Sequence, residues 1–396
     1  MSQKLRRISV LLALIIQANS FILFNSAQAI ESFKFQGNGF GHGVGLSQIG
    51  AKAMAMNGKS AEEIIKYYFT GVTVEPVADW YDVRVNIGHQ LKGAKIQLAS
   101  SSGFMQINGY KVADSKTIAS FTYSDSGIIT TIKKGKALVA TLPPNNQIEI
   151  QWSGTRFLDG DTAIVAFNNG KPTKYQFGQI NLLVVSKSIE ASNSVRLKDE
   201  YLYGISEVSS SWPMESLRAQ AIAARTYAIA KAGIYRPSCD CELYGTVKDQ
   251  LFVGITKISE ARYGALWKAA VDSTSVDEEN GEAITYMGNP ISAYYSSSSG
   301  GQTESALNAF GTAVDYLVPV PDPASLDPKL NPRYANWERT VSASIVAKAF
   351  GLTSVTKLTI TGKRIEATSQ EGTKSSLRIE TFRSRVGLPS STFKIS

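Results

Sequence analysis

The sequence predicts an α+β protein, in which a β-rich region is joined to a mixed α/β core. From about residue 77 to 190, short apolar alternations such as YDVRVNIG and NQIEIQW are separated by Gly, Asn, Asp and Ser, which is typical of strands and turns. Beyond residue 191 one strong helical pattern is followed by further strands. The 396 residues, 43% apolar and 19% charged, suffice for two domains or for one large domain with a subdomain.

The first 29 residues have the pattern of an export signal. A basic start (Lys4, Arg6 and Arg7) precedes an apolar run, and Ala27-Gln28-Ala29 is a small-residue cleavage site. We therefore expect cleavage after Ala29 and a secreted protein. A retained membrane anchor is the alternative, but polar residues interrupt the apolar run and shorten it below a comfortable span.

The formal net charge is +8, and it falls to +5 once the three basic residues of the signal are removed. The chain has no long Lys/Arg run and no basic helix interleaved with aromatic residues, so nucleic acid is not an expected partner. A mild positive balance in an exported protein favours loose attraction to an anionic cell envelope.

Cys239 and Cys241 are the only cysteines, and one residue separates them. They are either a pair of thiols or a strained local disulfide in a loop. A metal site would need two more ligands, and the only imidazoles, His42 and His89, are distant in sequence. We predict no metal and no other cofactor; zinc stays open as an alternative.

Three helices are marked by their end signals. LSQIGAKAMAMNG closes with Gly58, and SAEEIIKYYFTG places Ser60 and Glu63 at capping-box spacing. In WPMESLRAQAIAARTYAIAKAG, the proline suits a first helical turn, and small side chains form a face against which another backbone can pack. Arg225 on this last helix is either solvated or buried beside a partner, because a buried guanidinium needs one.

The segment GNGFGHGVG has glycine at every second position from Gly37 to Gly45. It fits neither the dinucleotide fingerprint nor the phosphate-binding loop, and the following GLSQIG fails the pattern of a nucleophile elbow. In an extended segment these glycines would leave one face bare, open to a flat ligand or to another strand. A strand covered by a tightly packed helix is the alternative.

Three segments together resemble the SpoIID/LytB family, which includes stage II sporulation protein D and the amidase enhancers of bacterial cell walls. They are YLYGISEVSSSWPMESLRAQAIAARTYA, YYSSSSGGQTES and GFGHGVGLSQIGAKAMAMNGKSAEEIIKYYFTGV. DCELYGTVKDQLFVG and the closing IETFRSRVGLPSSTFKI resemble further family motifs, so the resemblance covers nearly the whole chain after the signal. EVSSSWP, however, is longer than the family's usual segment after the active glutamate.

The resemblance implies a peptidoglycan lytic transglycosylase that cleaves glycan strands at the bond between N-acetylmuramic acid and N-acetylglucosamine. Glu207 falls at the family's catalytic glutamate. One carboxyl group is then enough, because it protonates the glycosidic oxygen and afterwards takes a proton from the sugar's own 6-hydroxyl, which closes a 1,6-anhydro ring without a water nucleophile. Such an acid needs a raised pKa, for which Trp212, Tyr203 and Tyr227 could supply an apolar cleft.

The same carry-over gives further candidate sugar-contacting or cleft-forming residues. They are His42, Gln48, Arg225, Gln250, Tyr295, Ser297 and Gly300. A non-catalytic wall-binding protein that stimulates a separate cell-wall amidase is the alternative function, and that amidase is then an additional partner beside the glycan strands.

In the family the His-Gly-Val-Gly segment usually follows the Phe-Arg…Ser-x-x-Phe stretch, whereas here it comes first. We interpret this order as a circular permutation, which is tolerated when termini lie close together. It predicts that residues near Phe33 and Phe393 are spatial neighbours. The predicted division is a signal peptide (1–29), a permuted part of the catalytic core (30–76), a β-rich subdomain (77–190) and the SpoIID-like catalytic core (191–396).

Overall fold

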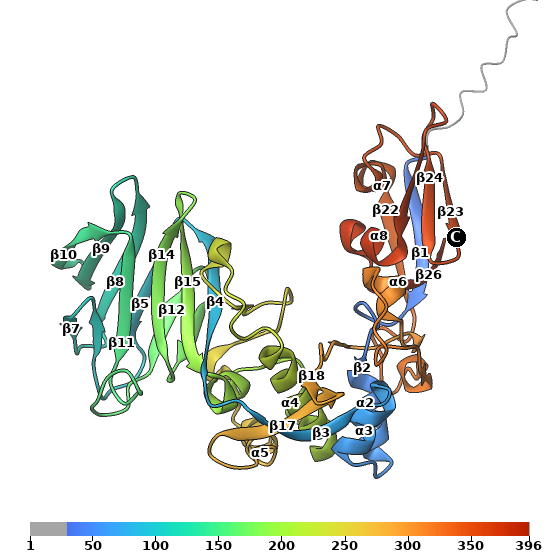
Figure 1. Ribbon diagram of the computed structural model, residues 1–396. Coiled ribbons are helices and arrows are strands. Elements are labelled where there is room, and N and C mark those ends of the chain that lie inside the picture. The colour runs from blue at the N-terminus through green and yellow to red at the C-terminus, as the bar shows by residue number, and fades with distance from the viewer. Residues whose placement is uncertain (1–29, 396) are drawn as a thin grey trace, which may run out of the picture. The chain divides into compact units, whose positions relative to one another are not determined.

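The computed structural model describes residues 30–395, so the predicted signal peptide and its cleavage site lie outside the described residues. The chain falls into two compact units. A small unit contains residues 30–36, 338–388 and 394–395, and a large unit contains residues 37–337 and 389–393. Helices and strands are both abundant (Figure 1), which confirms the α+β class. Within residues 30–395, no helix has the length and apolar character needed to span a membrane.

The β-rich part of the large unit consists of two sheets. In order across the first, the strands are β10 (Ala137–Asn145), β9 (Gly127–Lys134), β8 (Thr117–Ser124), β5 (Gly93–Leu98), β12 (Val165–Asn168) and β13 (Pro172–Tyr175). The second contains β16 (Leu243–Tyr244), β4 (Asp82–Leu91), β15 (Ser188–Arg196), β14 (Gln179–Val185), β11 (Gln147–Trp152), β6 (Met105–Ile107) and β7 (Tyr110–Val112).

Side-chain alternation explains the core of these sheets. In β11 the sequence QIEIQW buries Ile148, Ile150 and Trp152 completely, while the residues between them face outward. Similar alternation in the neighbouring strands forms one hydrophobic cluster. Since β16 joins this sheet from a segment beyond residue 240, the strands and the following helices belong to the same compact unit, and the predicted boundary at residues 190/191 stays a prediction.

The helical part of the large unit is centred on α4 (Met214–Ile229), which packs against α2 (Gln48–Met56), α3 (Ala61–Tyr68), α5 (Gly264–Asp272) and β17 (Asn280–Tyr286). The predicted capping box of α3 is confirmed, because Ser60 and Glu63 form it. Pro213, which was predicted in the first turn, lies one position earlier as the N-cap of α4. Ser47, which was not predicted, caps α2. The small face of α4 lets these elements approach closely, as its alanines predict.

Short strands complete this part of the chain. They are β2 (Leu46–Ser47) with β19 (Tyr295–Ser296); β3 (Thr73–Ala78) and β18 (Asn289–Pro290) with β17; and β20 (Gly301–Gln302) with β21 (Pro321–Asp322), while α6 (Ala306–Phe310) is a single helical turn.

The glycine segment is not the regular extended strand that we predicted. β1 (Ser32–Asn38) includes only its first two residues, Gly37 and Asn38, and Gly39, Gly41, Gly43 and Gly45 all have positive φ, a region that residues with a Cβ rarely adopt. The expected close approach is real: a Cβ on Gly45 would lie 2.2 Å from the carbonyl oxygen of Tyr294. The glycines therefore allow both the conformation and the contact with the segment that contains the serine run.

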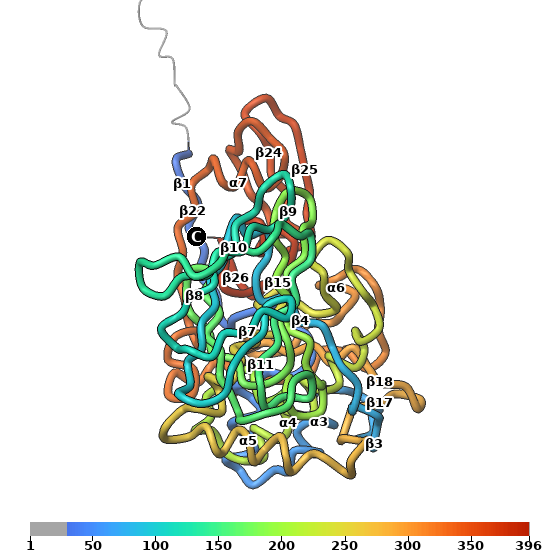
Figure 2. The backbone as a smooth tube through the Cα atoms, turned by 90° about the vertical axis from the view of Figure 1, so that its left-hand side faces the viewer, coloured from blue at the N-terminus to red at the C-terminus, as the bar shows by residue number. Residues whose placement is uncertain are grey.

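The small unit contains one three-stranded sheet of order β22-β1-β26 and a second of order β23-β24-β25. Its elements beyond β1 are β22 (Trp337–Ser342), α7 (Ala343–Phe350), β23 (Lys357–Thr361), β24 (Arg364–Thr368), β25 (Lys374–Arg378), α8 (Ile379–Val386) and β26 (Thr392–Ile395). The first and last strands of the described chain are thus sheet neighbours, as predicted for the segments around Phe33 and Phe393, and Figure 2 shows them close together. The permutation itself stays a prediction.

Candidate active site

Glu207 is held in place by a neighbouring backbone segment. Ile205 forms an isolated bridge with Phe252, and the amide of Ser206 donates to the carbonyl of Leu251. Because residues 205–207 run beside residues 250–252, the amide of Leu251 can donate a 2.6 Å hydrogen bond to Oε1 of Glu207. The conformation of Glu207 is therefore set by the end of the loop that contains the two cysteines.

Burial raises the pKa of Glu207 above its usual value, because the charged form loses hydration. Two hydrogen bonds, one from the Leu251 amide and one from the Tyr295 hydroxyl, oppose the shift by favouring the carboxylate. The net direction is upward. Glu207 is thus a carboxyl group that can be protonated at higher pH than an exposed glutamate and whose anion still has two donors.

A buried hydrogen-bond chain orients the Tyr295 hydroxyl. Nε2 of Gln250 donates to the carbonyl of Ala224 at 3.3 Å and to the Tyr295 hydroxyl at 2.8 Å, and Oε1 of Gln250 accepts from the Tyr201 hydroxyl at 2.8 Å. A carbonyl can only accept, so the amide group of Gln250 has one orientation. Tyr295 consequently accepts from Gln250, and its own proton is directed to Glu207.

The loop that departs from the family pattern, residues 208–213, is held by two side chains. The buried Lys257 donates from Nζ to the carbonyl of Val208 at 2.5 Å. Ser210 donates to Glu260 at 2.7 Å, and Glu260 also pairs with Lys257 at 3.8 Å. These contacts fix the chain immediately after Glu207.

Asp249 is an acidic residue beside the same hydrogen-bond chain, but its oxygens are already occupied. Oδ1 accepts from Tyr227 at 2.9 Å, and Oδ2 accepts from the Tyr244 amide at 2.8 Å and from Arg236 at 2.5 Å. Burial would raise its pKa, yet these donors lower it overall. Asp249 therefore stays ionised and positions the loop.

Of the predicted site residues, Gln250 and Tyr295 lie in the immediate network of Glu207. His42 stands at the other end of a row of aromatic rings: its ring centroid is 5.9 Å from that of Tyr294, which is 6.1 Å from that of Tyr227, itself 6.3 Å from that of Tyr295. Nδ1 of His42 also accepts from the Val44 amide. His42 thus shares a cluster with the site and is separated from the acid by these rings.

The other predicted residues have mainly structural contacts. Gln48 is buried and donates to Gln220 on α4 at 3.1 Å. Ser297 accepts from the Ile49 amide through its carbonyl, which ties the serine run to α2. Gly300 has a φ of +83°, and a Cβ there would lie 2.6 Å from the carbonyl oxygen of Asn38. Gln48 thus joins α2 to α4, and Ser297 and Gly300 let the serine run pack against α2 and the glycine segment.

The structure corrects the assignment of Arg225 as a sugar contact. Its side chain is 0% exposed and pairs with Asp79 at 2.8 Å, with a further hydrogen bond to Thr274 at 2.9 Å. No surface remains through which a glycan could reach it. Tyr203, which we expected beside the acid, donates to Asp272 at 2.5 Å, and Trp212 packs near Lys52.

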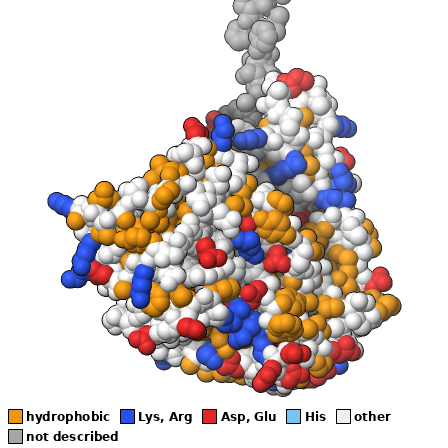
Figure 3. All heavy atoms as spheres, turned by 60° about the vertical axis from the view of Figure 1, so that its left-hand side comes forward, with side chains coloured by type: hydrophobic (Ala, Val, Ile, Leu, Met, Phe, Trp, Pro, Cys, Tyr) orange, Lys and Arg blue, Asp and Glu red, His pale blue; other side chains and the backbone are white. Residues whose placement is uncertain are grey.

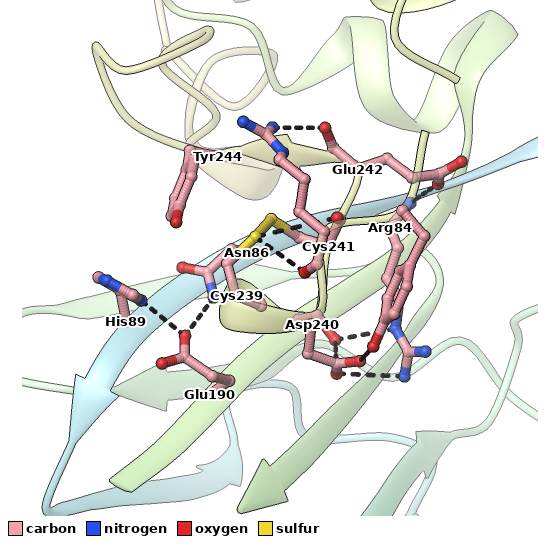
Figure 4. The surroundings of a disulfide bond; sticks show 12 residues. Arg84, Asn86, His89, Glu190, Cys239, Asp240, Cys241, Glu242 and Tyr244 are labelled. Atoms are coloured by element: carbon pink, nitrogen blue, oxygen red, sulfur yellow. Dashed lines mark hydrogen bonds and ion pairs between the residues drawn. A yellow bond between two sulfur atoms is a disulfide. The ribbon is translucent and has the colours of Figure 1, made fainter. Parts of the chain in front are cut away.

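Cys239 and Cys241 form a local disulfide, so they are not a pair of free thiols. Figure 4 shows how the surrounding loop is fixed to β4 and β15: Asn86 donates to the Cys239 carbonyl at 2.8 Å and to Glu190 at 2.9 Å, and His89 contacts Glu190 at 2.9 Å. The same loop continues to Asp249, Gln250 and Leu251. This anchoring therefore positions the donors that act on Glu207.

Tyr201, Lys257 and the Leu251 amide were not identified from the sequence. Tyr201 lies in the quoted YLYGIS segment, but only the fold brings its hydroxyl to Gln250. A backbone amide leaves no signal in a sequence, and a lone lysine in a loop is indistinguishable from a solvated one.

Comparison with known proteins supports the family. Residues 185–286 match the family model described as SpoIID, stage II sporulation protein. An uncharacterised protein of Brachyspira hyodysenteriae is 33% identical over 143 residues, which is 36% of each chain. The amidase enhancer of Bacillus subtilis is 31% identical over 137 residues, which is 34% of this chain and 16% of that protein.

Stage II sporulation protein D of Bacillus subtilis is 27% identical over 210 residues, which is 50% of this chain and 59% of that protein. The matches thus span between 16% and 59% of these three relatives. No solved structure matches the chain. The matched segment 185–286 contains Glu207, Gln250 and α4, and over this segment the chain is similar to the SpoIID family.

Proposed function

We propose that this chain acts at the bacterial cell wall as a peptidoglycan lytic transglycosylase, with Glu207 as its single acid and base. The observation that carries the proposal is the environment of Glu207: a carboxyl group with a raised pKa, held by the Leu251 amide and the Tyr295 hydroxyl. A catalytic acid must be protonated near the working pH, and burial favours that state.

In the first step, protonated Glu207 gives its proton to the glycosidic oxygen between N-acetylmuramic acid and N-acetylglucosamine, and the C1–O bond breaks. The resulting carboxylate is stabilised by the two donors. It then takes the proton of the 6-hydroxyl of the same muramic sugar, whose oxygen bonds to C1 and closes the 1,6-anhydro ring. The proton that left Glu207 is replaced, so the enzyme is ready for another turn.

The role of Asp249 favours this route over ordinary hydrolysis. Hydrolysis by a carboxyl pair needs a second carboxylate free to activate water or to attack C1. The oxygens of Asp249 instead accept hydrogen bonds from Tyr227, Tyr244 and Arg236. A reaction that uses the substrate's own hydroxyl suits a site in which one carboxyl group carries the proton both ways.

The test is incubation of purified protein, residues 30–396, with glycan strands stripped of their stem peptides, followed by mass spectrometry. We expect products with 1,6-anhydro ends. Glu207→Gln should abolish them while strand binding is retained. Glu278→Gln, which makes the same change at an exposed position, should behave as the parent protein.

Stimulation of a cell-wall amidase is the second candidate, favoured by the similarity to the amidase enhancer of Bacillus subtilis. The same preparation separates the two. Absence of anhydro products from the parent protein, together with faster release of stem peptides by an added amidase, would support the second function and reject the first.

A further inference from the structure

The excess of positive charge belongs to the small unit. Residues 30–36, 338–388 and 394–395 contain 11 Lys or Arg and five Glu, a net charge of +6. The rest of the chain after residue 29 contains 27 basic and 28 acidic residues, a net charge of −1. Blue and red side chains are accordingly interspersed over the lower part of Figure 3. A protein-wide average of mild positive charge therefore conceals one strongly basic unit.

Within this unit the basic residues meet on one sheet. β23, β24 and β25 are antiparallel, with α7 and α8 packed against them. Ile365 and Ala367 of β24 are 0% exposed and form the inner side of the sheet. By strand alternation the opposite side presents polar residues, and the charged ones among them are Lys357, Arg364, Glu366, Lys374 and Arg378.

The four cations form two pairs at opposite ends of this sheet face. Arg364 lies directly opposite Arg378, and Lys357 and Lys374 flank Thr368 from its two sides. Like charges directly opposite each other destabilise an antiparallel pair. Within residues 30–395 none of the four cations is ion-paired to a carboxylate, although Arg364 also donates to Ser376 at 2.9 Å. An anion between Arg364 and Arg378 would relieve this repulsion, and Lys357 and Lys374 offer a second cationic site across Thr368.

We propose that the outer face of the β23-β24-β25 sheet binds an anionic cell-envelope polymer that carries phosphodiester groups at successive repeat units. This choice of partner rests on the proposed cell-wall function, whereas the binding itself does not need Glu207. Four residue steps along β24, from Arg364 to Thr368, separate the two cation pairs, which is about 13 Å at about 3.3 Å per residue. A single small anion occupies one pair, but a flexible polymer reaches both.

The composition of the face distinguishes the partner from other polyanions. Its remaining outward residues are Thr359, Thr361, Thr368 and Ser376, so it offers no apolar side chain for insertion into a lipid surface and no aromatic ring for stacking on a base. Glu366 lies between the two pairs and repels an anion there. These features favour a hydroxyl-rich polymer with spaced phosphates.

The experiment compares binding of soluble poly(glycerol phosphate) by the whole chain after the signal and by two variants. The test variant carries Lys357→Gln, Arg364→Gln, Lys374→Gln and Arg378→Gln. The control variant removes the same four charges from exposed positions of the large unit, with Lys116→Gln, Lys133→Gln, Lys136→Gln and Lys171→Gln. Circular dichroism and thermal unfolding establish that both variants are folded.

We expect at least a tenfold loss of affinity in the test variant and less than a twofold loss in the control. The slope of log affinity against log salt should become shallower by about two to three units in the test variant. The reason is that a phosphate no longer contacted keeps its counterions, so fewer counterions are released on binding. Equal losses in the two variants would overturn the proposal, since net charge alone would then be responsible. Tighter binding to a duplex DNA oligomer or to phosphatidylglycerol vesicles would overturn the choice of partner.

Cleavage of peptide-free glycan strands provides the link to the proposed function. Such strands lack the phosphate polymer, so both charge variants should cleave them as the parent does. If the test variant loses poly(glycerol phosphate) binding but still cleaves the strands, the result supports the proposed role of the sheet face and says nothing about Glu207. If only Glu207→Gln loses cleavage, the result supports the proposed role of Glu207 and says nothing about the sheet face.

Discussion

At the scale of single residues, the direction of hydrogen bonds decides what the site can do. The amide of Gln250 is oriented by the carbonyl of Ala224, and this orientation leaves the Tyr295 proton for Glu207. In the proposed mechanism Tyr295 therefore acts on the reacting carboxyl group of Glu207, while Gln250 and Tyr201 are positioning residues.

Replacing Tyr295 by phenylalanine should therefore lower kcat by about 10- to 100-fold, because a hydrogen bond to a charged group contributes roughly 1.5–3 kcal/mol. Loss of this donor also removes an influence that lowers the pKa of Glu207. The alkaline limb of the pH–rate profile should consequently move to higher pH. Tyr286→Phe, at a partly buried tyrosine of β17, is the matched control and should change neither quantity. An unchanged alkaline limb in Tyr295→Phe would contradict the assigned hydrogen bond.

The stability of the fold should also depend on Glu207. Its pKa is higher in the folded chain than in the unfolded one, so its contribution is fully present below the unfolded pKa and is lost as the pH rises through the folded pKa. Glu207→Gln removes the ionisation. We expect the variant to melt roughly 2 °C above the parent protein at pH 8 and at the same temperature at pH 4. Thermal unfolding across this pH range checks the sign, and a variant that is less stable at pH 8 would show that burial does not dominate.

At the scale of elements, the glycine segment does two things, and glycine is needed for each. Positive φ disfavours any residue with a Cβ, and close approach of a carbonyl excludes the Cβ itself. Gly45 and Gly58 separate these effects, because their φ values are +73° and +80° but only Gly45 is crowded, by the Tyr294 carbonyl.

Gly58→Ala should therefore destabilise the protein by about 1–2 kcal/mol, the cost of the left-handed conformation. Gly45→Ala should cost more, by roughly 2 kcal/mol or above, because the Tyr294 backbone must also shift. Chemical denaturation of both variants gives the difference directly. Equal values would mean that the serine-containing segment moves away easily and that the close approach is not a structural requirement.

Local signals in the sequence were sufficient for elements but not for distant partners. The capping box of Ser60 and Glu63 involves residues three apart, and the strand pattern of β11 is contained in six residues, so both were predictable. The partner of Arg225, by contrast, is Asp79, 146 positions away. Nothing near Arg225 distinguishes a buried ion pair from a surface arginine. For the same reason the family resemblance indicated Glu207 and Tyr295 as separate candidates, whereas their contact and the Leu251 amide emerged only from the fold.

At the scale of the whole molecule, chain order and spatial order differ. β1 opens the described chain and β26 closes it, yet the two strands are neighbours in one sheet. In β-sheets such neighbours are commonly consecutive in sequence, and here most of the chain separates them. A permutation that brings residues 30–80 behind residue 396 would make the two strands consecutive.

A permuted chain that runs from Tyr81 to Ser396 and continues through a ten-residue Gly/Ser linker into Ile30 to Trp80 should therefore fold. The linker can extend to about 33 Å, which permits either relative direction of the two strands. The new ends lie beside Trp80, which is 56% exposed. We expect cooperative unfolding within about 5 °C of the parent protein and the same activity toward peptide-free glycan strands. A second permutant with the same linker, opened at Gly135 in the turn between β9 and β10, controls for the linker itself. If that control folds and the first permutant does not, residues 30–80 must precede the rest of the chain, and the order of the motifs cannot be explained by a permutation that leaves the fold unchanged.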